Sequence, residues 1–183
     1  MHLGRLELHR PEPPDVPELF ALYADPEVWR GDPLTRHTDI AQTERLVAHW
    51  RAGWDRDGLG MWVARSTEPG AAGRLAGIGG AAVRLGVAWN VGFRLRPAFW
   101  GRGLAQEITA AAVGAARQLR PDLPLTAYLL EGNERSRRTT ERAGLRLVWR
   151  GPDAGNPDPD AVRLVYADRS LDGDLLDRLT ARP

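Results

Sequence analysis

The stretch 91–107 constrains the fold of this chain more than any other part of the sequence. It begins with apolar residues at every second position, a pattern typical of a strand with one apolar face. Pro97 ends that strand, because proline has no N–H to donate to a sheet. Gly101 and Gly103 then allow a sharp turn, and a helical pattern begins at Leu104. The sequence therefore predicts a strand, a glycine turn and the start of a helix.

This turn predicts a binding site for a phosphate group. The first N–H groups of a helix have no intrahelical partner, and that end of the helix carries partial positive charge. Glycines in the turn let the backbone approach a ligand closely. A Walker loop is excluded because no Gly-Lys-Ser/Thr follows, and the dinucleotide fingerprint lacks its third glycine. The alternative is a tight turn that binds no ligand.

The segment Trp100-Gly-Arg-Gly-Leu-Ala105 resembles the acyl-CoA pyrophosphate loop of the GNAT N-acetyltransferase superfamily. Gly103 and Ala105 occupy its two small positions, whereas Trp100 departs from the Gln or Arg of the general pattern. The ribosomal-protein-alanine N-acetyltransferase branch usually has Pro-x-x-Trp-Gly-x-Gly-x-Ala-x-Glu here, and residues 97–107 fit that form. The resemblance implies that acetyl-CoA, the cosubstrate of the family, is bound by Phe93, Arg94, Leu95, Trp100, Gly101, Arg102, Gly103, Leu104 and Ala105.

A second motif supports the same resemblance. Asn133-Glu-Arg-Ser136, followed by Glu141-Arg-Ala-Gly-Leu145, is similar to the Asn-x-x-Ser helix of that branch and the glycine corner that ends it. Two motifs in this order and spacing are more specific than either alone. The resemblance covers roughly residues 3–166, and it implies further contacts to CoA from Asn133 and Arg137.

Length and composition agree with one acyltransferase domain over residues 1–183, with its core at about 3–166 and a short C-terminal tail. Hydrophobic residues make up 43% and charged residues 27% of the chain, and the formal net charge is +1. This balance gives no reason to expect nucleic acid or a membrane as partner. With no cysteine, thiolate metal sites and disulfides are excluded, and no metal is expected.

The source and compartment follow from simple features of the sequence. No apolar run approaches twenty residues and no signal-like start is present, so a cytoplasmic protein is expected. All 25 basic residues are arginine, which together with much Ala, Gly and Pro indicates GC-rich bacterial coding. The oligomeric state is open, with a homodimer among the options.

The element pattern predicts an α/β (α+β) fold. The crossover between residues 91 and 130 makes its two strands parallel. We therefore expect a mixed, mostly antiparallel sheet of six or seven strands with helices on both faces. The resemblance adds a V-shaped splay between the two central parallel strands, which the pantetheine arm enters. The expected strands are 3–10, 60–65, 75–83, 87–95, 125–130, 145–150 and 162–166.

The resemblance implies transfer of an acetyl group from acetyl-CoA to a primary amine, either a protein N-terminus or a small molecule. A backbone N–H of Arg94 or Leu95 is expected to polarise the thioester carbonyl. Many members of the branch have a glutamate base at the position of Asn90, and asparagine cannot take a proton. Three routes stay open for this step: a water chain, Glu131, or an amine that arrives already neutral.

Ser136 is the candidate acid for the leaving thiolate. Many relatives have a tyrosine about seven residues after Asn133, but Thr140 stands there in this chain. Ser136 lies one helical turn beyond Asn133, and its hydroxyl can donate to sulfur directly or through water. The candidate catalytic residues are therefore Ser136, Asn133 and Glu131. Because the usual Glu and Tyr are missing, a catalytically inactive CoA-binding or partner-binding domain remains the alternative.

The acceptor is expected to enter between two loops, residues 28–39 and 151–160. The candidate acceptor-binding residues are Trp29, Asp32 and Asn90. Aspartates in these loops predict a mouth that attracts a cationic amine. The alternative is that they only form turns next to Gly and Pro. These aspartates are Asp32, Asp39, Asp153, Asp158 and Asp160.

Overall fold

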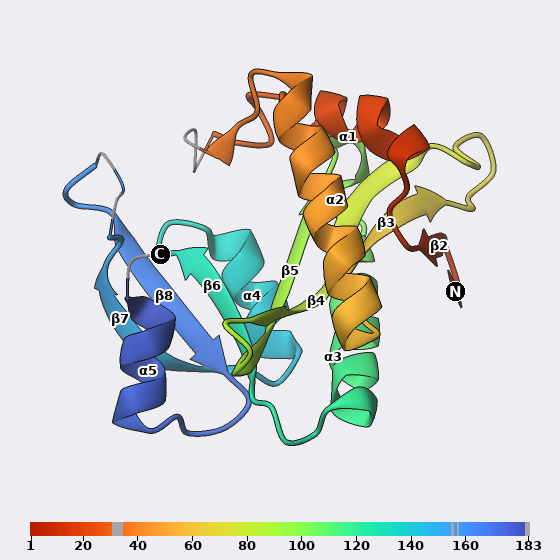
Figure 1. Ribbon diagram of the computed structural model, residues 1–183. Coiled ribbons are helices and arrows are strands. Elements are labelled where there is room, and N and C mark those ends of the chain that lie inside the picture. Colours follow the sequence, from red (N-terminus) through yellow and green to blue (C-terminus); the bar gives the residue numbers. More distant parts are fainter. Residues whose placement is uncertain (31–34, 155, 157, 182–183) are drawn as a thin grey trace.

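The computed structural model describes residues 1–30, 35–154, 156 and 158–181. Within these residues, eight strands form one sheet in the order β1-β2-β3-β4-β5-β6-β8-β7 (Figure 1). Neighbouring strands are antiparallel, except that β5 and β6 run parallel. The predicted mixed, mostly antiparallel sheet is confirmed. The strands are β1 (His2–Leu3), β2 (Leu6–His9), β3 (Met61–Ser66), β4 (Leu75–Arg84), β5 (Ala88–Leu95), β6 (Leu125–Leu130), β7 (Arg146–Pro152) and β8 (Val162–Ala167).

The described sheet has one strand more than the sequence predicted. Gly4 adopts a left-handed conformation, with φ of 43°, and turns the chain back so that β1 pairs with β2. Glycine tolerates this conformation because it has no Cβ. Residues 3–10, expected as one strand, therefore contribute to a short hairpin. The other strands lie in the predicted segments.

Helices cover both faces of the sheet, as predicted. α2 lies in front of the sheet in Figure 1, and α3 lies behind it. α1 packs against α2, and α4 packs against α3 and β6. The helices of the described residues are α1 (Val16–Tyr23), α2 (Ile40–Asp57), α3 (Leu104–Leu119), α4 (Glu134–Arg142) and α5 (Gly173–Thr180).

Each face of the sheet has its own hydrophobic core. One core joins α1 and α2 to the sheet and includes Leu19 and Ile78. The other lies under α3 and includes Trp89 and Ile108. Gly79 on β4 brings α3 close, since a Cβ at this position would lie 2.5 Å from the Ile108 side chain. Gly79 therefore serves helix packing, whereas Gly77 and Gly80 allow close approach of the backbone beside them.

β5 and β6 separate soon after they begin. Within the described residues they pair only at Trp89 with Leu125 and at Asn90 with Thr126. Beyond these positions β6 continues its pairing with β8, while β5 remains paired with β4. The predicted splay between the two parallel strands is confirmed. It leaves one edge of the second half of β5 without a neighbouring strand.

Candidate active site

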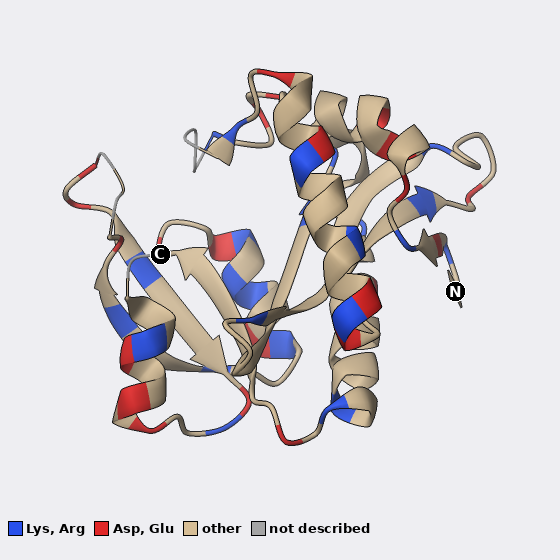
Figure 2. Cartoon of the chain, in the orientation of Figure 1, with Lys and Arg blue, Asp and Glu red and all other residues tan. Residues whose placement is uncertain are grey.

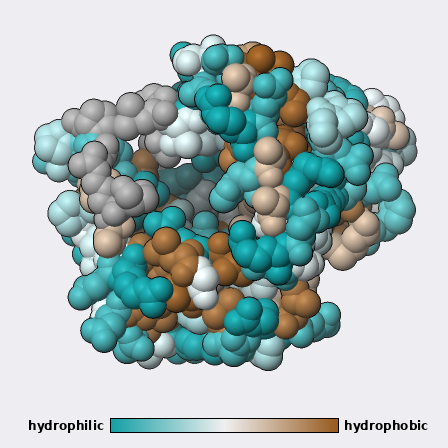
Figure 3. All heavy atoms as spheres, viewed as in Figure 1, coloured by the Kyte–Doolittle hydropathy of each residue, from teal (hydrophilic) through white to brown (hydrophobic). Residues whose placement is uncertain are grey.

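A cleft of about 1400 Å³ opens where β5 and β6 diverge. Its walls are the second half of β5, the glycine turn before α3, the strand β6 and the first turns of α4. Figure 3 shows the surface hollowed at this place, and Figure 2 shows arginines on α4 beside it. This volume exceeds that of most pockets for small ligands, so the cleft has room for a long molecule.

The glycine turn forms one end of the cleft. Gly101 and Gly103 have φ of 71° and 79°, in the left-handed region. Gly103 is the N-cap of α3, and its carbonyl accepts hydrogen bonds from the backbone N–H groups of Gln106 at 3.0 Å and Glu107 at 3.2 Å. The earlier N–H groups of the helix have no preceding carbonyl within the helix to accept them. They are therefore available to an anion at the cleft.

The Trp100 side chain connects this turn to the sheet by a hydrogen bond. Its indole Nε1 donates a hydrogen bond to the Leu95 carbonyl at 2.8 Å, at the end of β5. The guanidinium of Arg135, on α4, lies 5.0 Å from the centre of an indole ring of Trp100. Trp100 thus holds the turn at a fixed distance from β5 and also connects it to α4.

Arg5 lies beside the turn, and sequence reasoning missed it. A Cβ on Gly103 would lie 3.6 Å from Arg5 Nη2. The guanidinium donates a hydrogen bond to Glu107, and this bond raises the pKa of Arg5. No local signal marks Arg5, because the β1–β2 hairpin brings it to the turn from the other end of the chain. Arg102, which was expected here, pairs with Glu68 and does not line the cleft.

The backbone of β5 presents polar groups to the cleft at alternate residues. Trp89 donates its N–H towards β6, and Arg96 donates its N–H towards β4. By alternation, the N–H groups of Phe93 and Leu95 point to the side from which β6 has diverged. The N–H of Arg94 points to β4. Of the two N–H groups expected to polarise a carbonyl, only that of Leu95 therefore faces the cleft, together with that of Phe93, which was expected to bind acetyl-CoA.

Asn133 and Ser136 both line the cleft at the start of α4. Asn133 is the N-cap, and its Oδ1 accepts a hydrogen bond from the Ser136 backbone N–H at 3.1 Å. This bond uses the backbone of Ser136 and leaves its hydroxyl to other partners. The Asn-x-x-Ser spacing thus has a structural role that also holds both side chains at the cleft.

The arginines of α4 divide between the cleft and the rest of the helix surface. Arg135 and Arg138 line the cleft. Arg137 does not, because it lies on the side of α4 that carries Glu134, to which it donates at 2.9 Å. The expectation that Arg137 faces CoA therefore differs from the structure, since successive helix positions point in different directions.

Glu131 lies at the cleft but is held by a cation. Its two carboxylate oxygens accept hydrogen bonds from Arg150 at 2.7 and 2.9 Å. These bonds lower the pKa of Glu131. A carboxylate held in this way is a weak base, so the geometry opposes the expected catalytic role for Glu131.

On the acceptor side, the predicted residues occupy different places. Asn90 lines the cleft. Trp29 is buried instead, and the guanidinium carbon of Arg94 lies 3.4 Å from the centre of one of its rings. Arg94 Nη1 also donates to the Val28 carbonyl at 3.2 Å. Asp32 lies outside the described residues. Arg94 therefore separates Trp29 from the cleft.

The described loop aspartates form turns and ion pairs. Asp39 is the N-cap of α2 and accepts from the Ala41 N–H at 3.0 Å. Asp153 accepts two hydrogen bonds from Arg163, at 2.8 and 2.9 Å. Asp158 accepts from a backbone N–H in its own loop, although it does line the cleft. These contacts favour the turn-forming explanation over an acidic mouth.

Tyr128 on β6 is a further cleft residue that sequence reasoning missed. Residues 125–130 read as a continuous apolar run, and the strand alone gave no sign that one side chain faces a cavity. The Tyr128 hydroxyl and the Asn90 Oδ1 are both buried and have no hydrogen-bond partner. The Gln106 Oε1 is a third such atom among the residues that line the cleft, and this clustering indicates that a ligand meets them there.

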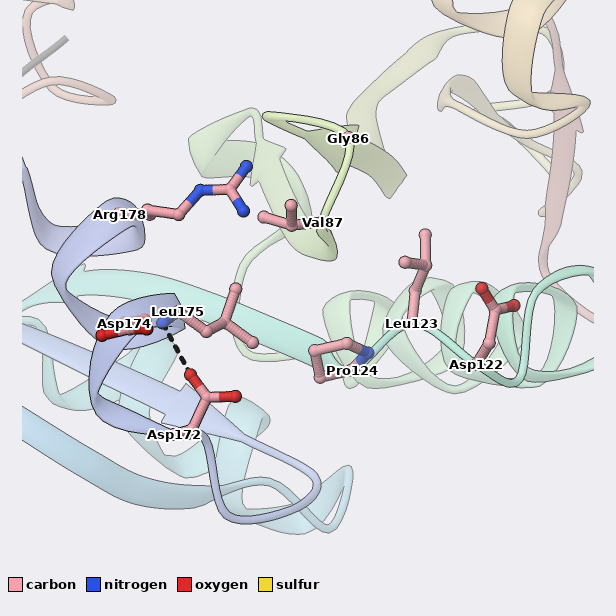
Figure 4. A pocket seen from close by; sticks show the side chains of 9 residues that line it. All are labelled: Gly86, Val87, Asp122, Leu123, Pro124, Asp172, Asp174, Leu175 and Arg178. Carbon is pink, nitrogen blue, oxygen red and sulfur yellow. Dashed lines mark hydrogen bonds between the residues drawn. The ribbon is translucent and has the colours of Figure 1, made fainter.

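A second, smaller hollow of about 470 Å³ lies beside α5 (Figure 4). Its polar side chains are Asp122, Asp172, Asp174 and Arg178. Asp172 already serves as the N-cap of α5, accepting from the Leu175 N–H at 2.8 Å. Among the described residues this hollow shares no lining residue with the cleft. The glycine turn therefore points to the cleft as the candidate site.

Within the described part of the chain, every helix is too short or too polar to span a membrane. The same residues contain no group of three or more His, Cys, Asp or Glu side chains placed to hold a metal ion.

Comparisons with known proteins agree with this geometry. A protein described as a GnaT-family acetyltransferase from Bordetella pertussis has a TM-score of 0.76 and 20% identity, covering 92% of this chain and 98% of its own. A Salmonella typhimurium acetyltransferase that modifies the N-terminal serine of ribosomal protein L7/L12 has a TM-score of 0.72 and 21% identity, covering 92% and 96%. The S. typhimurium acetyltransferase yncA, solved with its cofactor acetyl-CoA, has a TM-score of 0.69 and 17% identity, covering 93% and 96%.

The family model of the acetyltransferase (GNAT) domain matches residues 5–146. This match includes β2, the splayed strands, the glycine turn and α4. It covers most of the chain, and the chain therefore belongs to the GNAT acetyltransferase family.

Proposed function

We propose that this protein transfers an acetyl group from acetyl-CoA to a primary amine. The observation that carries the proposal is the parting of β5 and β6 beside the N-terminus of α3. It creates one cleft with an anion seat at one end, a free strand edge along its wall and buried polar atoms on the far side. Each of these features suits a different part of the reaction.

The anion seat suits the pyrophosphate of CoA. The Leu104 and Ala105 N–H groups lie at the positive end of α3, where a phosphate is stabilised by both hydrogen bonds and the helix dipole. Arg5 stands beside the turn, and Arg135 and Arg138 line the cleft from α4. A guanidinium can make two parallel hydrogen bonds to a phosphate. Arg135 and Arg138 replace the expected Arg102 and Arg137 in the proposal, whereas Arg5, like Arg102, is paired with a glutamate and does not line the cleft.

The free edge of β5 suits the pantetheine arm and the thioester. An extended chain with amide groups can pair with a strand edge as an added strand does. The N–H groups of Phe93 and Leu95 are the donors on that edge. Leu95 N–H is placed to polarise a carbonyl, because the Leu95 carbonyl is held by Trp100 and fixes the end of the strand.

Ser136 supplies the proton to the leaving sulfur in this proposal. Its backbone is fixed by Asn133, so the hydroxyl is held at the cleft. We exclude Glu131 from the role of base, because Arg150 lowers its pKa and occupies both of its oxygens. Among the routes open for deprotonation, an amine that arrives neutral then fits the site best.

The branch that the two motifs resemble acts on a narrower class of acceptors than primary amines in general. That branch acetylates the N-termini of ribosomal proteins, and one similar structure is of an enzyme that modifies an N-terminal serine. At 21% identity this likeness supports the fold alone. A peptide N-terminus that begins with Ala or Ser is therefore the first acceptor to try, with small-molecule amines beside it.

A thiol-release assay with a panel of amines tests the proposal. The panel contains Ala- and Ser-starting peptides, aminoglycosides and polyamines, with an N-terminally acetylated copy of each peptide as its matched control. We expect CoA release that depends on a free amine in the panel and disappears with the blocked peptides. Acetyl-CoA binding without release for any amine would instead indicate a CoA-binding domain without catalysis.

A further inference from the structure

Two buried polar atoms on one wall of the cleft have no hydrogen-bond partner. They are the Asn90 Oδ1 on β5 and the Tyr128 hydroxyl on β6. Leaving a buried polar group without a partner is destabilising, and folded proteins rarely keep one without a use. Thr126 and Arg84 lie close enough to Tyr128 to affect its pKa, but neither makes a hydrogen bond of normal geometry with the hydroxyl.

Sheet register places the two side chains together. Asn90 is the parallel partner of Thr126, and Tyr128 comes two residues later on the same strand. Residues two apart on a strand share a face, so Asn90 and Tyr128 point to the same side of the sheet. Arg94 lies on that face as well, opposite Ile78, which belongs to the core under α1 and α2. The side chains of Asn90 and Tyr128 therefore face away from α3 and its glycine turn.

A ligand that donates hydrogen bonds would satisfy both atoms. Asn90 Oδ1 can only accept, and a tyrosine hydroxyl can accept as well as donate. The Thr126 hydroxyl cannot donate to either atom, because it donates its hydrogen to the Trp89 carbonyl at 2.8 Å. A nitrogen with two N–H groups has one donor for each of the two atoms. In a neutral primary amine, those two bonds leave the lone pair free.

The charges around the corner of the cleft formed by Asn90 and Tyr128 favour the neutral form of an amine. The guanidinium carbon of Arg84 lies 4.6 Å from the centre of the Tyr128 ring, and Arg94 extends from the same face of β5. Nearby cations disfavour a further positive charge and lower the pKa of a bound amine. Other titratable groups that line the cleft from α1, the end of β6, the β7–β8 loop and β8 are Tyr23, Glu131, Asp158, Asp160 and Arg163.

Two of the three carboxylates in that set accept hydrogen bonds within the protein. Glu131 is paired with Arg150, and Asp158 accepts from the backbone of its own loop. Burial raises the pKa of Tyr128, against the effect of Arg84, so its hydroxyl stays protonated near neutral pH. The corner therefore offers neutral hydrogen-bonding groups among cations.

We infer that Asn90 and Tyr128 form the seat of the acceptor nitrogen and select a neutral primary amine by its two N–H groups. This rests on the proposed function and makes a glutamate base at position 90 unnecessary. In the transfer, the nitrogen lone pair forms a bond to the acetyl carbon and the carbon–sulfur bond breaks. One proton leaves nitrogen and one reaches sulfur, so the protein ends unchanged.

The test uses Tyr128→Phe and Asn90→Leu, with Tyr166→Phe as the matched control. Tyr166 is a buried tyrosine outside the cleft whose hydroxyl donates to Glu141 at 2.9 Å. We expect each cleft variant to raise the acceptor KM of an Ala-starting peptide at least tenfold, with the acetyl-CoA Kd within twofold of wild type. Their Tm should stay the same or rise, because each removes an unsatisfied buried atom. Tyr166→Phe should lower the Tm and leave the acceptor KM unchanged.

Calorimetry of the same peptide with the CoA-saturated protein gives a readout that needs no turnover. A wild type that binds the peptide but acetylates no amine would refute the proposed function, while the affinities of the variants would still decide the inference. An N-methyl-Ala peptide, which has one N–H fewer when neutral, should bind at least tenfold more weakly. Peptide affinity within twofold of wild type in both cleft variants, or equal binding of the two peptides, would overturn the inference.

Discussion

The glycine turn before α3 and the corner formed by Asn90 and Tyr128 face the same cleft but are built differently. The turn offers main-chain N–H groups from consecutive residues, and its glycines are needed for the backbone conformation itself. The corner offers side-chain atoms from two strands that meet only through sheet register. A site of the first kind is written in one short stretch of sequence, whereas a site of the second kind depends on which strands become neighbours.

The largest effect is expected at the turn, from Ala105→Asp. Ala105 lines the cleft in the first turn of α3, where a carboxylate stabilises the helix by roughly 0.3–1 kcal/mol but repels an anionic ligand. We expect the acetyl-CoA Kd to rise about 100-fold, or roughly 2.7 kcal/mol, measured by calorimetry.

The matched control for this change is Ala110→Asp, on the same helix at an exposed position. It adds the same charge away from the turn and should leave the acetyl-CoA Kd within about threefold of wild type. Equal losses of affinity in the two variants would remove the special role of the turn, because net charge alone would then explain both.

The next largest effect is expected for Ser136→Ala. Loss of the proton donor should lower kcat about tenfold or more and leave the acetyl-CoA KM within a few-fold, since the hydroxyl acts on the leaving sulfur. Steady-state kinetics measure both parameters. Thr139→Ala, at another hydroxyl that lines the cleft, is the control, and its own hydroxyl is occupied by the Arg135 carbonyl. A kcat that is unchanged in Ser136→Ala would exclude this residue from the mechanism.

The smallest effect on activity is expected for Glu131→Gln. Removal of a catalytic base should lower kcat about 100-fold or more. Removal of a carboxylate that only pairs with Arg150 should lower kcat less than about twofold. Because the folded-state pKa of Glu131 is lowered, its stabilising effect is present above its unfolded pKa and is lost as pH falls through the folded value. The Tm difference between the variant and wild type should therefore shrink as the pH falls from 7 into the acid range. A large fall in kcat would restore Glu131 as the base.

Local patterns were enough to predict most of the fold. Period-two and helical patterns located the strands and α3, and Pro97 with the glycines marked their boundary. Gly4 was the exception, because nothing in the alternation of residues 3–10 shows that this glycine adopts a positive φ. Asp39 was likewise interpreted as a charge in a loop, whereas it is the N-cap of α2.

The candidate site was predictable only where consecutive residues build it. The turn and the Asn133–Ser136 motif could be located from the sequence, since local spacing sets both. Arg5 and Tyr128 could not, because a hairpin and a sheet register bring them to the cleft. Arg137 was expected to contact CoA but does not line the cleft, and its direction could not be predicted because it depends on how α4 packs.

Amide hydrogen exchange with and without acetyl-CoA tests the central claim most directly. If acetyl-CoA lies along β5 with its pyrophosphate on the turn, the amides of Phe93, Leu95, Leu104 and Ala105 should exchange more slowly when it is bound. Amides near the hollow beside α5, at residues 172–178, should not change. Protection around α5 with none at the β5 edge or the turn would contradict the account.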